Sequence, residues 1–375
     1  VAMLVLVTQD DEIPVSAPES DEWSLPAGTP ISEQYVVGDV IGKGGMATVY
    51  RGYHRALDRE VAIKVMHPWL EEFPGLGERF LREARTQATL SSPNVATVHD
   101  LGYAGSHAFI VSELVQGDDL RTVLEIHGAL PTQTAVNIVW HTAMGLSEAH
   151  AAGIVHRDIK PENLMLCRTS GGTSLKIIDF GIAKIQAPAQ GGLTRPRDGV
   201  MGSPGYMAPE QFEAPGSEDV RADVWAMGAV LVELLTGKAA FDGETLPEIC
   251  CKIIAGRRPP LSELCPGISE ELEAIVTRCL ALDPDERFEN AAELAAALRD
   301  YSLAASAATT VAPPPPSRRA ERYHGRRWAI AVSALIGLAA LISSRGELDP
   351  ESLRASARAG AARLVELSGA RPWLD

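Results

Sequence analysis

The sequence has no excess of basic residues. Its 375 residues carry 34 Lys and Arg against 49 Asp and Glu, a formal net charge of -15. Non-specific nucleic-acid binding depends on Lys and Arg side chains that neutralise phosphates. We therefore expect no nucleic-acid partner.

Cysteine is sparse, and its spacing matches no metal motif. An odd number of cysteines without a secretory signal indicates reduced thiols in a cytosolic compartment. The five residues form no Cys-x-x-Cys pair, which argues against a zinc site. They are Cys167, Cys250, Cys251, Cys265 and Cys279.

Long apolar runs are also scarce. A first run at residues 2–7 lacks a basic flank and is short for a signal peptide, so we interpret residues 1–34, which turn acidic and proline-bearing, as a flexible leader. A second run at residues 328–344 is shorter than the roughly 20 residues that comfortably span a bilayer. It is either a single membrane span or a buried helix, and we favour the span because no domain follows to bury it.

Arginines gather on the N-terminal side of this second run. They end an Ala/Pro-rich and then Arg-rich linker at residues 302–327. Because positively charged flanks stay on the cytoplasmic side, this pattern predicts a single-pass protein of the cell membrane with residues 1–327 inside. Residues 345–375 would form a short amphipathic tail outside, too short for a domain with its own core.

Hydrophobic periodicity divides the central region into two parts. Short alternating runs at 36–41, 48–53, 61–66, 95–101 and 109–114 predict an antiparallel sheet, interrupted by one helix near residues 77–90. After Gly117 the period becomes helical, with a helix from Pro131 that Gly153 ends and others at 219–236, 245–255, 269–281 and 290–301. The sequence thus predicts an α+β fold with a small sheet lobe, 35–115, and a larger helical lobe, 117–301.

A glycine-rich stretch lies between the first two predicted strands. Missing Cβ atoms would let backbone N–H groups approach phosphate oxygens, although a simple hairpin turn explains the stretch equally well. The residues are Ile41, Gly42, Lys43, Gly44 and Gly45, followed by Val49. This motif alone does not decide between the two interpretations.

Lys64 ends the apolar run Val61-Ala62-Ile63-Lys64 and faces inward if the alternation holds. Burying an unpaired ammonium is costly, so the lysine needs an anionic partner. Glu83, on the helix that follows, is the partner we expect, and the remaining donors of Lys64 could hold nucleotide phosphates. Otherwise Lys64 is a surface charge at a strand end.

The densest chemistry lies in the stretch Val155 to Asn163, which reads Val-His-Arg-Asp-Ile-Lys-Pro-Glu-Asn. A lone aspartate is most often a solvated loop residue, and a lone histidine a core residue. Asp158, Lys160 and Asn163 stand together here, and Asp179-Phe180-Gly181 follows after a second apolar run. This combination predicts a phosphoryl-transfer site.

Taken in order, these motifs resemble the protein kinase catalytic domain, in particular the bacterial serine/threonine kinases of eukaryotic (Hanks) type. The resemblance covers about residues 35–301 and includes Ala208-Pro209-Glu210 and a late arginine, Arg287. It implies the two-lobed kinase fold. It also implies transfer of the ATP γ-phosphoryl group to Ser or Thr hydroxyls of proteins, with ATP and Mg²⁺ as cofactors.

The resemblance also assigns roles at the site. Asp158 would orient the substrate hydroxyl and accept its proton, Lys160 would lie against the γ-phosphate, and Asn163 and Asp179 would bind Mg²⁺. Nucleotide contacts would come from both lobes. They are Val49 and Ala62 above the adenine, Met165 below it, the backbones of Glu113 and Val115 at the hinge, and Asp119 at the ribose or a basic substrate residue.

Two positions depart from the family pattern. Ser112 precedes the hinge where a larger residue is common, so we predict an enlarged pocket behind the adenine site. Gln87, one turn after Glu83, replaces a larger apolar residue. This leaves open how firmly the active arrangement is held without a partner or phosphate.

Other matched positions are regulatory or structural. Arg157 would pair with a phosphate on Thr194, added by autophosphorylation, and Ser203 would hydrogen-bond Lys160 and Asp158. Asp223 would brace the catalytic loop, and Glu210 would form a buried ion pair with Arg287. A single membrane span together with phosphorylation between copies would suit a homodimer.

Two rival functions fit the sequence less well. A pseudokinase, acting as a binding scaffold, usually lacks the lysine, the catalytic aspartate or a metal ligand, whereas Lys64, Asp158, Asn163 and Asp179 are all present. A kinase of small molecules typically lacks the Ala-Pro-Glu segment and the helices after it. The sequence therefore favours an active protein kinase.

Overall fold

The computed structural model describes residues 23–72, 75–169, 172–180, 204–213 and 219–309. The predictions for residues 1–22 and for 310–375, including the apolar run at 328–344, lie outside the described residues. Among the residues described, no helix is long and apolar enough to cross a membrane.

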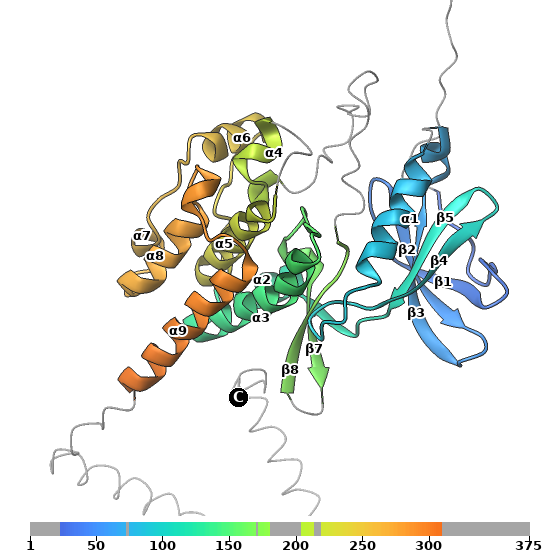
Figure 1. The fold of residues 1–375 in the computed structure, drawn as a ribbon, viewed down its shortest axis with the longest axis horizontal. Helices are drawn as coiled ribbons and strands as arrows, with labels where there is room; N and C mark the ends of the chain where they lie inside the picture. The colour runs from blue at the N-terminus through green and yellow to red at the C-terminus, as the bar shows by residue number, and fades with distance from the viewer. Residues whose placement is uncertain (1–22, 73–74, 170–171, 181–203, 214–218, 310–375) are drawn as a thin grey trace, which may run out of the picture. The chain divides into compact units, whose positions relative to one another are not determined.

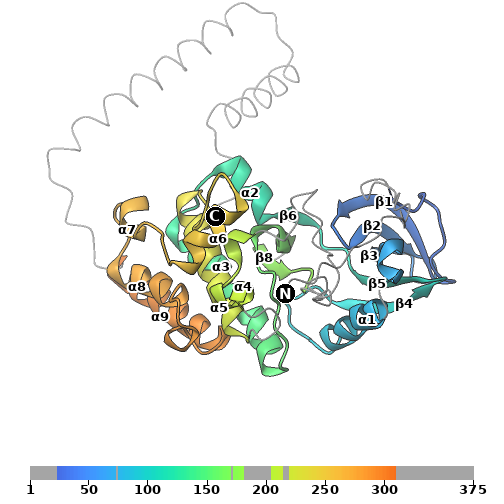
Figure 2. The ribbon, with the colours of Figure 1, turned by 90° about the horizontal axis from the view of Figure 1, so that it is seen from above.

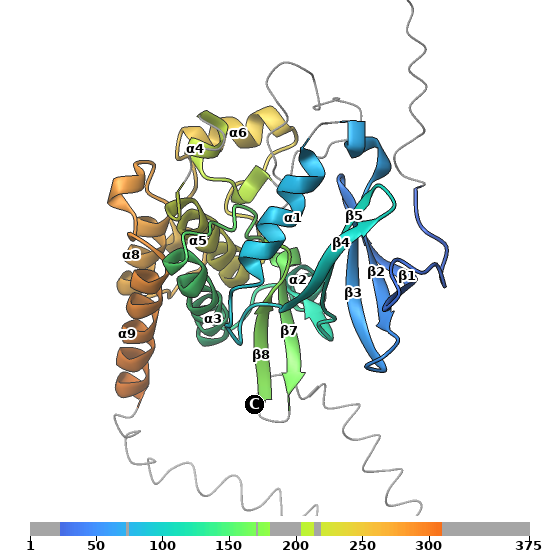
Figure 3. The same cartoon turned by 45° about the vertical axis from the view of Figure 1, so that its right-hand side comes forward.

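The first lobe is a five-stranded antiparallel sheet with the strand order β1-β2-β3-β5-β4. One helix, α1, packs on the sheet (Figure 3), and its Phe80, Leu81 and Ala84 join Met66 and Ile110 in one apolar cluster. The strands are β1 (Tyr35–Lys43), β2 (Ala47–His54), β3 (Arg59–Met66), β4 (Val98–Ala104) and β5 (His107–Glu113), and α1 spans Leu76–Gln87. The predicted sheet lobe with one helix is confirmed.

β4 begins at Val98, later than the predicted run at 95–101. The residues before it pair with the second lobe instead: Ala96 N donates to Ile177 O at 2.9 Å, and Ile177 N donates to Asn94 O at 2.8 Å. This stretch therefore joins the two lobes. Its apolar character reflects burial of Val95 and Ala96 at that junction.

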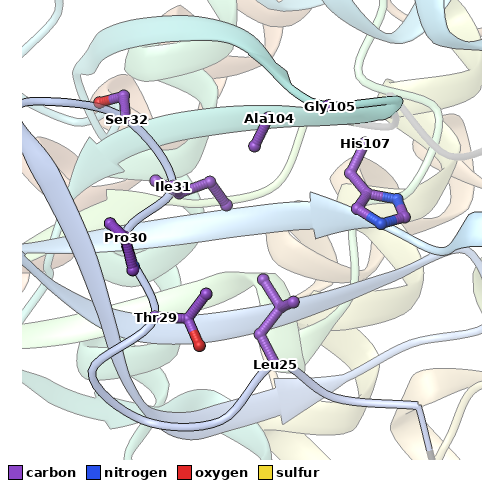
Figure 4. Close-up of a pocket in the computed structure, with 8 residues that line it drawn as sticks. All are labelled: Leu25, Thr29, Pro30, Ile31, Ser32, Ala104, Gly105 and His107. Carbon is purple, nitrogen blue, oxygen red and sulfur yellow. The ribbon is translucent and has the colours of Figure 1, made fainter.

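Residues 23–34 pack against the sheet, so the prediction of a flexible leader to residue 34 is wrong for this part. Trp23 contacts His67 and His107, with ring centroids 5.6 and 5.3 Å apart. Leu25 N donates to the buried Tyr50 Oη at 2.7 Å. Figure 4 shows Leu25 and Ile31 facing a pocket whose far wall is Ala104, Gly105 and His107.

The second lobe is organised around α5 (Arg221–Thr236), in which every residue from Ala222 to Leu235 is buried. A helix that is apolar all round belongs in the centre of a helical layer, and α5 packs on both α3 and α8 (Figures 1 and 2). The other helices are α2 (Leu120–His127), α3 (Thr132–Ala151), α4 (Pro209–Glu213), α6 (Leu246–Ile254), α7 (Leu261–Leu264), α8 (Glu270–Cys279) and α9 (Ala291–Thr309). The predicted helical lobe is confirmed, but α9 runs to Thr309, past the predicted end of the lobe at residue 301 and into the predicted linker at 302–327.

A small second sheet, β6-β7-β8, belongs to the second lobe and was not predicted. Its strands are β6 (Gly117–Asp119), β7 (Leu164–Thr169) and β8 (Gly172–Ile177). The register sets Asp119 opposite Met165, and β8 ends just before Asp179. Three predicted site residues from distant parts of the sequence thus lie near one edge.

Candidate active site

A cleft with a volume of about 510 Å³ runs between the two lobes, which is within the usual size of small-molecule sites. The predicted residues that line it are Ile41, Gly42, Val49, Ala62, Lys64, Glu113, Val115, Asp119, Asn163, Met165 and Asp179. Further residues that line the cleft, to which no motif assigned a contact, are Arg51, Ala96, Val98, Ile110, Leu114, Glu162 and Ile178. Ser112 and Gln87 also line the cleft.

The glycine-rich stretch forms the turn of the β1–β2 hairpin. Gly44 N donates to Ala47 O at 2.9 Å, and Gly42 pairs with Val49 at the cleft. A Cβ added to Gly42 would meet Val49 at an ordinary 3.8 Å. Packing within the protein therefore does not require glycine at this position. Lys43 and Gly45 lie in the same hairpin.

Lys64 lies in the cleft as expected, but its partner is different from the predicted one. Its Nζ contacts Asp179 Oδ1 at 2.9 Å, and within the described residues no ion pair joins it to Glu83. Glu83 is half-buried on α1, and burial raises its pKa while the charge of Arg157 opposes that rise. The expected Lys64–Glu83 pair is thus absent because the nearer anion is Asp179.

The catalytic-loop side chains converge on one carboxylate. Lys160 Nζ lies 3.0 Å from Asp158 Oδ2, and Asn163 Nδ2 donates to the same oxygen at 3.1 Å and to Asp158 O at 2.7 Å. The side chains of Asp158 and Lys160 are about four-fifths buried. The predicted trio is therefore brought together, with Asp158 at its centre.

Asp223 on α5 holds the backbone of the catalytic loop. Its carboxylate accepts the backbone N–H groups of His156 and Arg157, both at 2.8 Å, and lies 2.9 Å from His150 Nε2. Burial raises the pKa of Asp223, but the His150 hydrogen bond and nearby histidines outweigh it, so the pKa lies below its usual range. Arg157 takes a φ of 65°, a left-handed conformation that a non-glycine residue adopts only under constraint.

His156 packs rather than reacts. It is fully buried, Asp158 N donates to its Nδ1 at 3.3 Å, and its Nε2 lies 3.3 Å from Ile178 O. Its ring stands 4.6 Å from that of Phe180. Burial lowers the pKa of His156, so the neutral ring fits this environment.

The segment between β5 and β6 offers backbone groups to the cleft. The backbone N–H of Val115 takes part in no hydrogen bond within the part of the chain that the structure describes. The Glu113 side chain is held by Lys176 at 2.9 Å. Asp119 caps α2 by accepting from Thr122 N and Oγ1, both at 2.9 Å.

Arg287 and Glu210 form the predicted ion pair with bidentate geometry. The two guanidinium nitrogens donate to Glu210 Oε1 and Oε2 at 2.7 and 2.8 Å, and the Arg287 side chain is 0% exposed. Two further predicted residues, Thr194 and Ser203, lie outside the described residues. Arg157 is described, but the geometry of its predicted phosphate partner is not.

Among the described residues, no cluster of three or more His, Cys, Asp or Glu side chains could hold a metal ion. This is compatible with Mg²⁺, which often uses only one or two protein carboxylates together with substrate phosphates and water. Asn163 and Asp179 supply hard oxygen donors, and Asp179 uses only Oδ1 for Lys64. The donor set therefore fits the ion.

Comparisons with known proteins agree with this geometry. The model of the protein kinase domain matches residues 35–297. The chain is similar to the serine/threonine-protein kinase PknB of Mycobacterium leprae, with 37% identity over 272 residues that cover 72% of this chain and 43% of that protein. It is similar to PrkC of Bacillus subtilis at 36% identity, with 72% of this chain and 41% of that protein covered.

Among solved structures, the kinase domain of PknI from Mycobacterium tuberculosis matches with a TM-score of 0.59 and 28% identity, covering 74% of this chain and 99% of that one. The chain spans less than half the length of the two curated relatives. The fold, the order of the motifs and the match to the family model all indicate a protein kinase. This chain belongs to the protein kinase family, with homology to the bacterial Hanks-type serine/threonine kinases.

Proposed function

We propose that this chain is a serine/threonine protein kinase that transfers the γ-phosphoryl group of ATP to Ser or Thr hydroxyls of proteins. The observation that carries the proposal is the convergence of Lys160 and Asn163 on Asp158, beside a cleft that also holds Lys64 and Asp179. A pseudokinase would not need these five side chains together.

The cleft suits a nucleotide in shape and chemistry. Val49 and Ala62 come from the sheet and Met165 from β7, so they can enclose a flat base. The N–H of Val115, which has no hydrogen-bond partner among the described residues, can donate to the base. The protein leaves room for a Cβ at Gly42, so close approach of phosphates is a sufficient reason for glycine there.

In the proposed reaction, a bond forms between the substrate hydroxyl oxygen and the γ-phosphorus, while the bond from that phosphorus to the β–γ bridging oxygen breaks. Asp158 orients the hydroxyl and takes its proton, and ADP is the leaving group. Lys160 stabilises charge on the transferred group, and Lys64 holds the remaining phosphates. Bound Mg²⁺, held by Asn163 and Asp179, would neutralise phosphate charge.

Regulation and location extend the proposal. A phosphate on Thr194, added by autophosphorylation, would pair with Arg157 and order the segment before Ala208-Pro209-Glu210. Ser203 would hydrogen-bond Lys160 and Asp158. The apolar run at 328–344 would tether the kinase to the cell membrane with its catalytic lobes in the cytoplasm, where two copies could meet as a homodimer.

The test uses the full chain with labelled ATP, Mg²⁺ and a generic protein substrate such as casein. Asp158→Asn keeps the shape of the loop but removes the proton acceptor, so transfer should fall by about 10²- to 10⁴-fold. Asp300→Asn, which removes only an exposed pair with Arg299, is the matched control and should retain activity. Equal label in wild type and Asp158→Asn would sink the proposal.

A further inference from the structure

A second charged cluster lies next to the catalytic loop, and the motifs gave no sign of it. Arg121, in the first turn of α2, donates from Nε to Glu162 Oε1 at 3.1 Å and from Nη1 to Glu233 Oε1 at 2.7 Å. Its Nη2 donates to Tyr206 Oη at 2.6 Å, and the Tyr206 hydroxyl in turn donates to Glu233 Oε2. One guanidinium thus binds three side chains from three different segments.

Each partner belongs to a part of the proposed site. Glu162 lies between Lys160 and Asn163 in the 3₁₀ turn Pro161–Asn163 and lines the cleft. Tyr206 ends the turn Pro204–Tyr206, just before Ala208-Pro209-Glu210. Glu233 lies on α5, the helix that carries Asp223. Arg121 itself lies two residues after Asp119, the cleft residue that caps α2.

The cluster depends on the guanidinium for its charge balance. Glu233 is 4% exposed, and an ionised carboxylate at that depth needs a cation. Burial opposes the charge of Arg121, but its hydrogen bond to Glu233 keeps its pKa above the ordinary value. Burial and the neighbouring Glu233 raise the pKa of Tyr206, so its phenol stays protonated and can donate.

Within the part of the chain that the structure describes, Arg121 is the one anchor of Glu162. Its Oε2 is buried without a hydrogen-bond partner, and Oε1 bonds only Arg121 among the described residues. The orientation of the Glu162 side chain, between Lys160 and Asn163 in the loop, therefore depends on its contact with Arg121. Loss of Arg121 would free this side chain and leave two carboxylates, Glu162 and Glu233, without their shared cation.

We infer that Arg121 is a positioning residue for phosphoryl transfer: by binding Glu162, Tyr206 and Glu233 at once, it holds the catalytic-loop turn in register with residues 204–206. This inference rests on the proposed kinase function. Lys160 and Asn163 would keep their orientation toward Asp158 through this contact. Residues 204–206 would be held at the same time.

The test compares kcat, the KM for ATP, the KM for the protein substrate and the thermal unfolding midpoint in variants of the whole chain. Arg121→Met keeps the length of the side chain and removes its donors, and we expect kcat to fall about 10- to 100-fold, since small misplacements near reacting groups are costly. The KM for ATP should stay within about twofold of wild type, because Arg121 does not line the nucleotide cleft. Arg121→Lys should recover part of kcat, since an ammonium reaches one carboxylate but lacks the planar fork.

Arg278→Met is the matched structural control. It removes the ion pair of Arg278 with Glu293, 2.7 Å long, and its stacking on Phe288, all away from the cleft. We expect this variant to lower the thermal midpoint without lowering kcat. If Arg121→Met behaves in the same way, with kcat within twofold of wild type, Arg121 is only structural and the inference is overturned.

A double-mutant cycle tests whether Arg121 acts through Glu162. In a Glu162→Gln background, Arg121→Met should reduce kcat by less than it does in wild type, because the two residues form one unit. Fully additive losses contradict the inference. If Arg121→Met fails to fold, Arg121→Lys and Glu162→Gln carry the test, and a wild-type kcat in both overturns it. If the wild type itself transfers no phosphoryl group, both the proposed function and this inference are wrong. If the wild type and Arg121→Met are equally active, only this inference is wrong.

Discussion

Removing the carboxylate of Glu210 should destabilise the helical lobe by leaving a buried cation. Arg287 is 0% exposed, and every nitrogen of its guanidinium is engaged: two donate to Glu210, and the backbone oxygens of Ala281, Arg221 and Leu282 accept the remaining bonds. The Cζ atom of Arg287 also lies 5.0 Å from the Trp225 ring centroid. Glu210 is therefore the counter-charge of a guanidinium that has no access to water.

The structure sets the expected size of the effect. Breaking a buried pair by removing one partner costs about 3–5 kcal/mol, and two hydrogen bonds to a charged group at about 1.5–3 kcal/mol each give a similar figure. Glu210 is 19% exposed, so water can reach part of the vacated space. We therefore expect about 3 kcal/mol for Glu210→Ala, the lower end of the range.

Urea unfolding followed by circular dichroism measures this loss as a shift of the midpoint at constant slope. Glu60→Gln is the control, because the pair of Arg51 and Glu60 has side chains 51% and 42% exposed and should contribute no more than about 1 kcal/mol. If Glu210→Ala costs no more than Glu60→Gln, the argument that Arg287 depends on Glu210 for its charge is refuted. A changed slope would instead show that the variant no longer unfolds as the wild type does.

Three further predictions follow from the site. Ser112→Met should narrow the cleft and weaken binding of adenine analogues with a bulky aryl extension, measured by calorimetry, whereas equal affinities for wild type and variant would count against the enlarged pocket. Mass mapping of protein incubated with ATP and Mg²⁺ should find phosphate on Thr194, and its absence there would remove the proposed clamp by Arg157. Burial lowers the pKa of His156, so below about pH 6.5 the unfolded chain takes up a proton that the folded chain does not. The contribution of this group to the free energy of unfolding should therefore be full above that pH. It should decline as the pH falls, by at most about 1.4 kcal/mol per pH unit. Urea midpoints between pH 7.5 and 6.0 measure this trend, and stability that stayed flat or rose toward pH 6.0 would contradict it.

The periodicity and spacing of apolar residues predicted most of the fold, because they indicate which side chains are buried. α5 is buried on every side and mostly apolar, and α1 keeps Phe80, Leu81 and Ala84 on one buried face. The apolar residues of 95–97 gave the same signal as a strand, yet they join the lobes through Asn94, Ala96 and Ile177. Burial can be predicted from hydrophobic pattern, but the partner that buries a segment cannot.

The N-terminal boundary was wrong for the opposite reason. Residues 23–34 contain two prolines, a glycine and mostly small or polar side chains, a composition typical of a flexible segment. A few apolar side chains suffice to fix it: Trp23 rests against two histidines, and Ile31 is 4% exposed. Isolated apolar residues have no periodicity, so their contacts with a distant sheet leave no local signal.

The site shows the same limit for charged groups. Asp158, Lys160 and Asn163 are neighbours in the chain, so one short loop brings them together and the motif predicts their contact. Arg121, Glu162, Tyr206 and Glu233 come from four separate segments and meet only in the folded lobe. Only Glu162 stood within a recognised motif, and nothing in the sequence indicated its partner.

Lys64 illustrates why the partner of a charge is harder to predict than its place. Strand alternation directed this lysine into the cleft, and the cost of an unpaired buried ammonium required an anion nearby. Glu83 on α1 was the expected partner, but whether it or Asp179 after β8 reaches Lys64 depends on how α1 packs on the sheet. In this structure Asp179 supplies Oδ1 at 2.9 Å, while Glu83 lies in the field of Arg157. Because that contact engages only one oxygen of Asp179, the second remains for a metal ion, so the observed pair is compatible with the proposed metal role of Asp179.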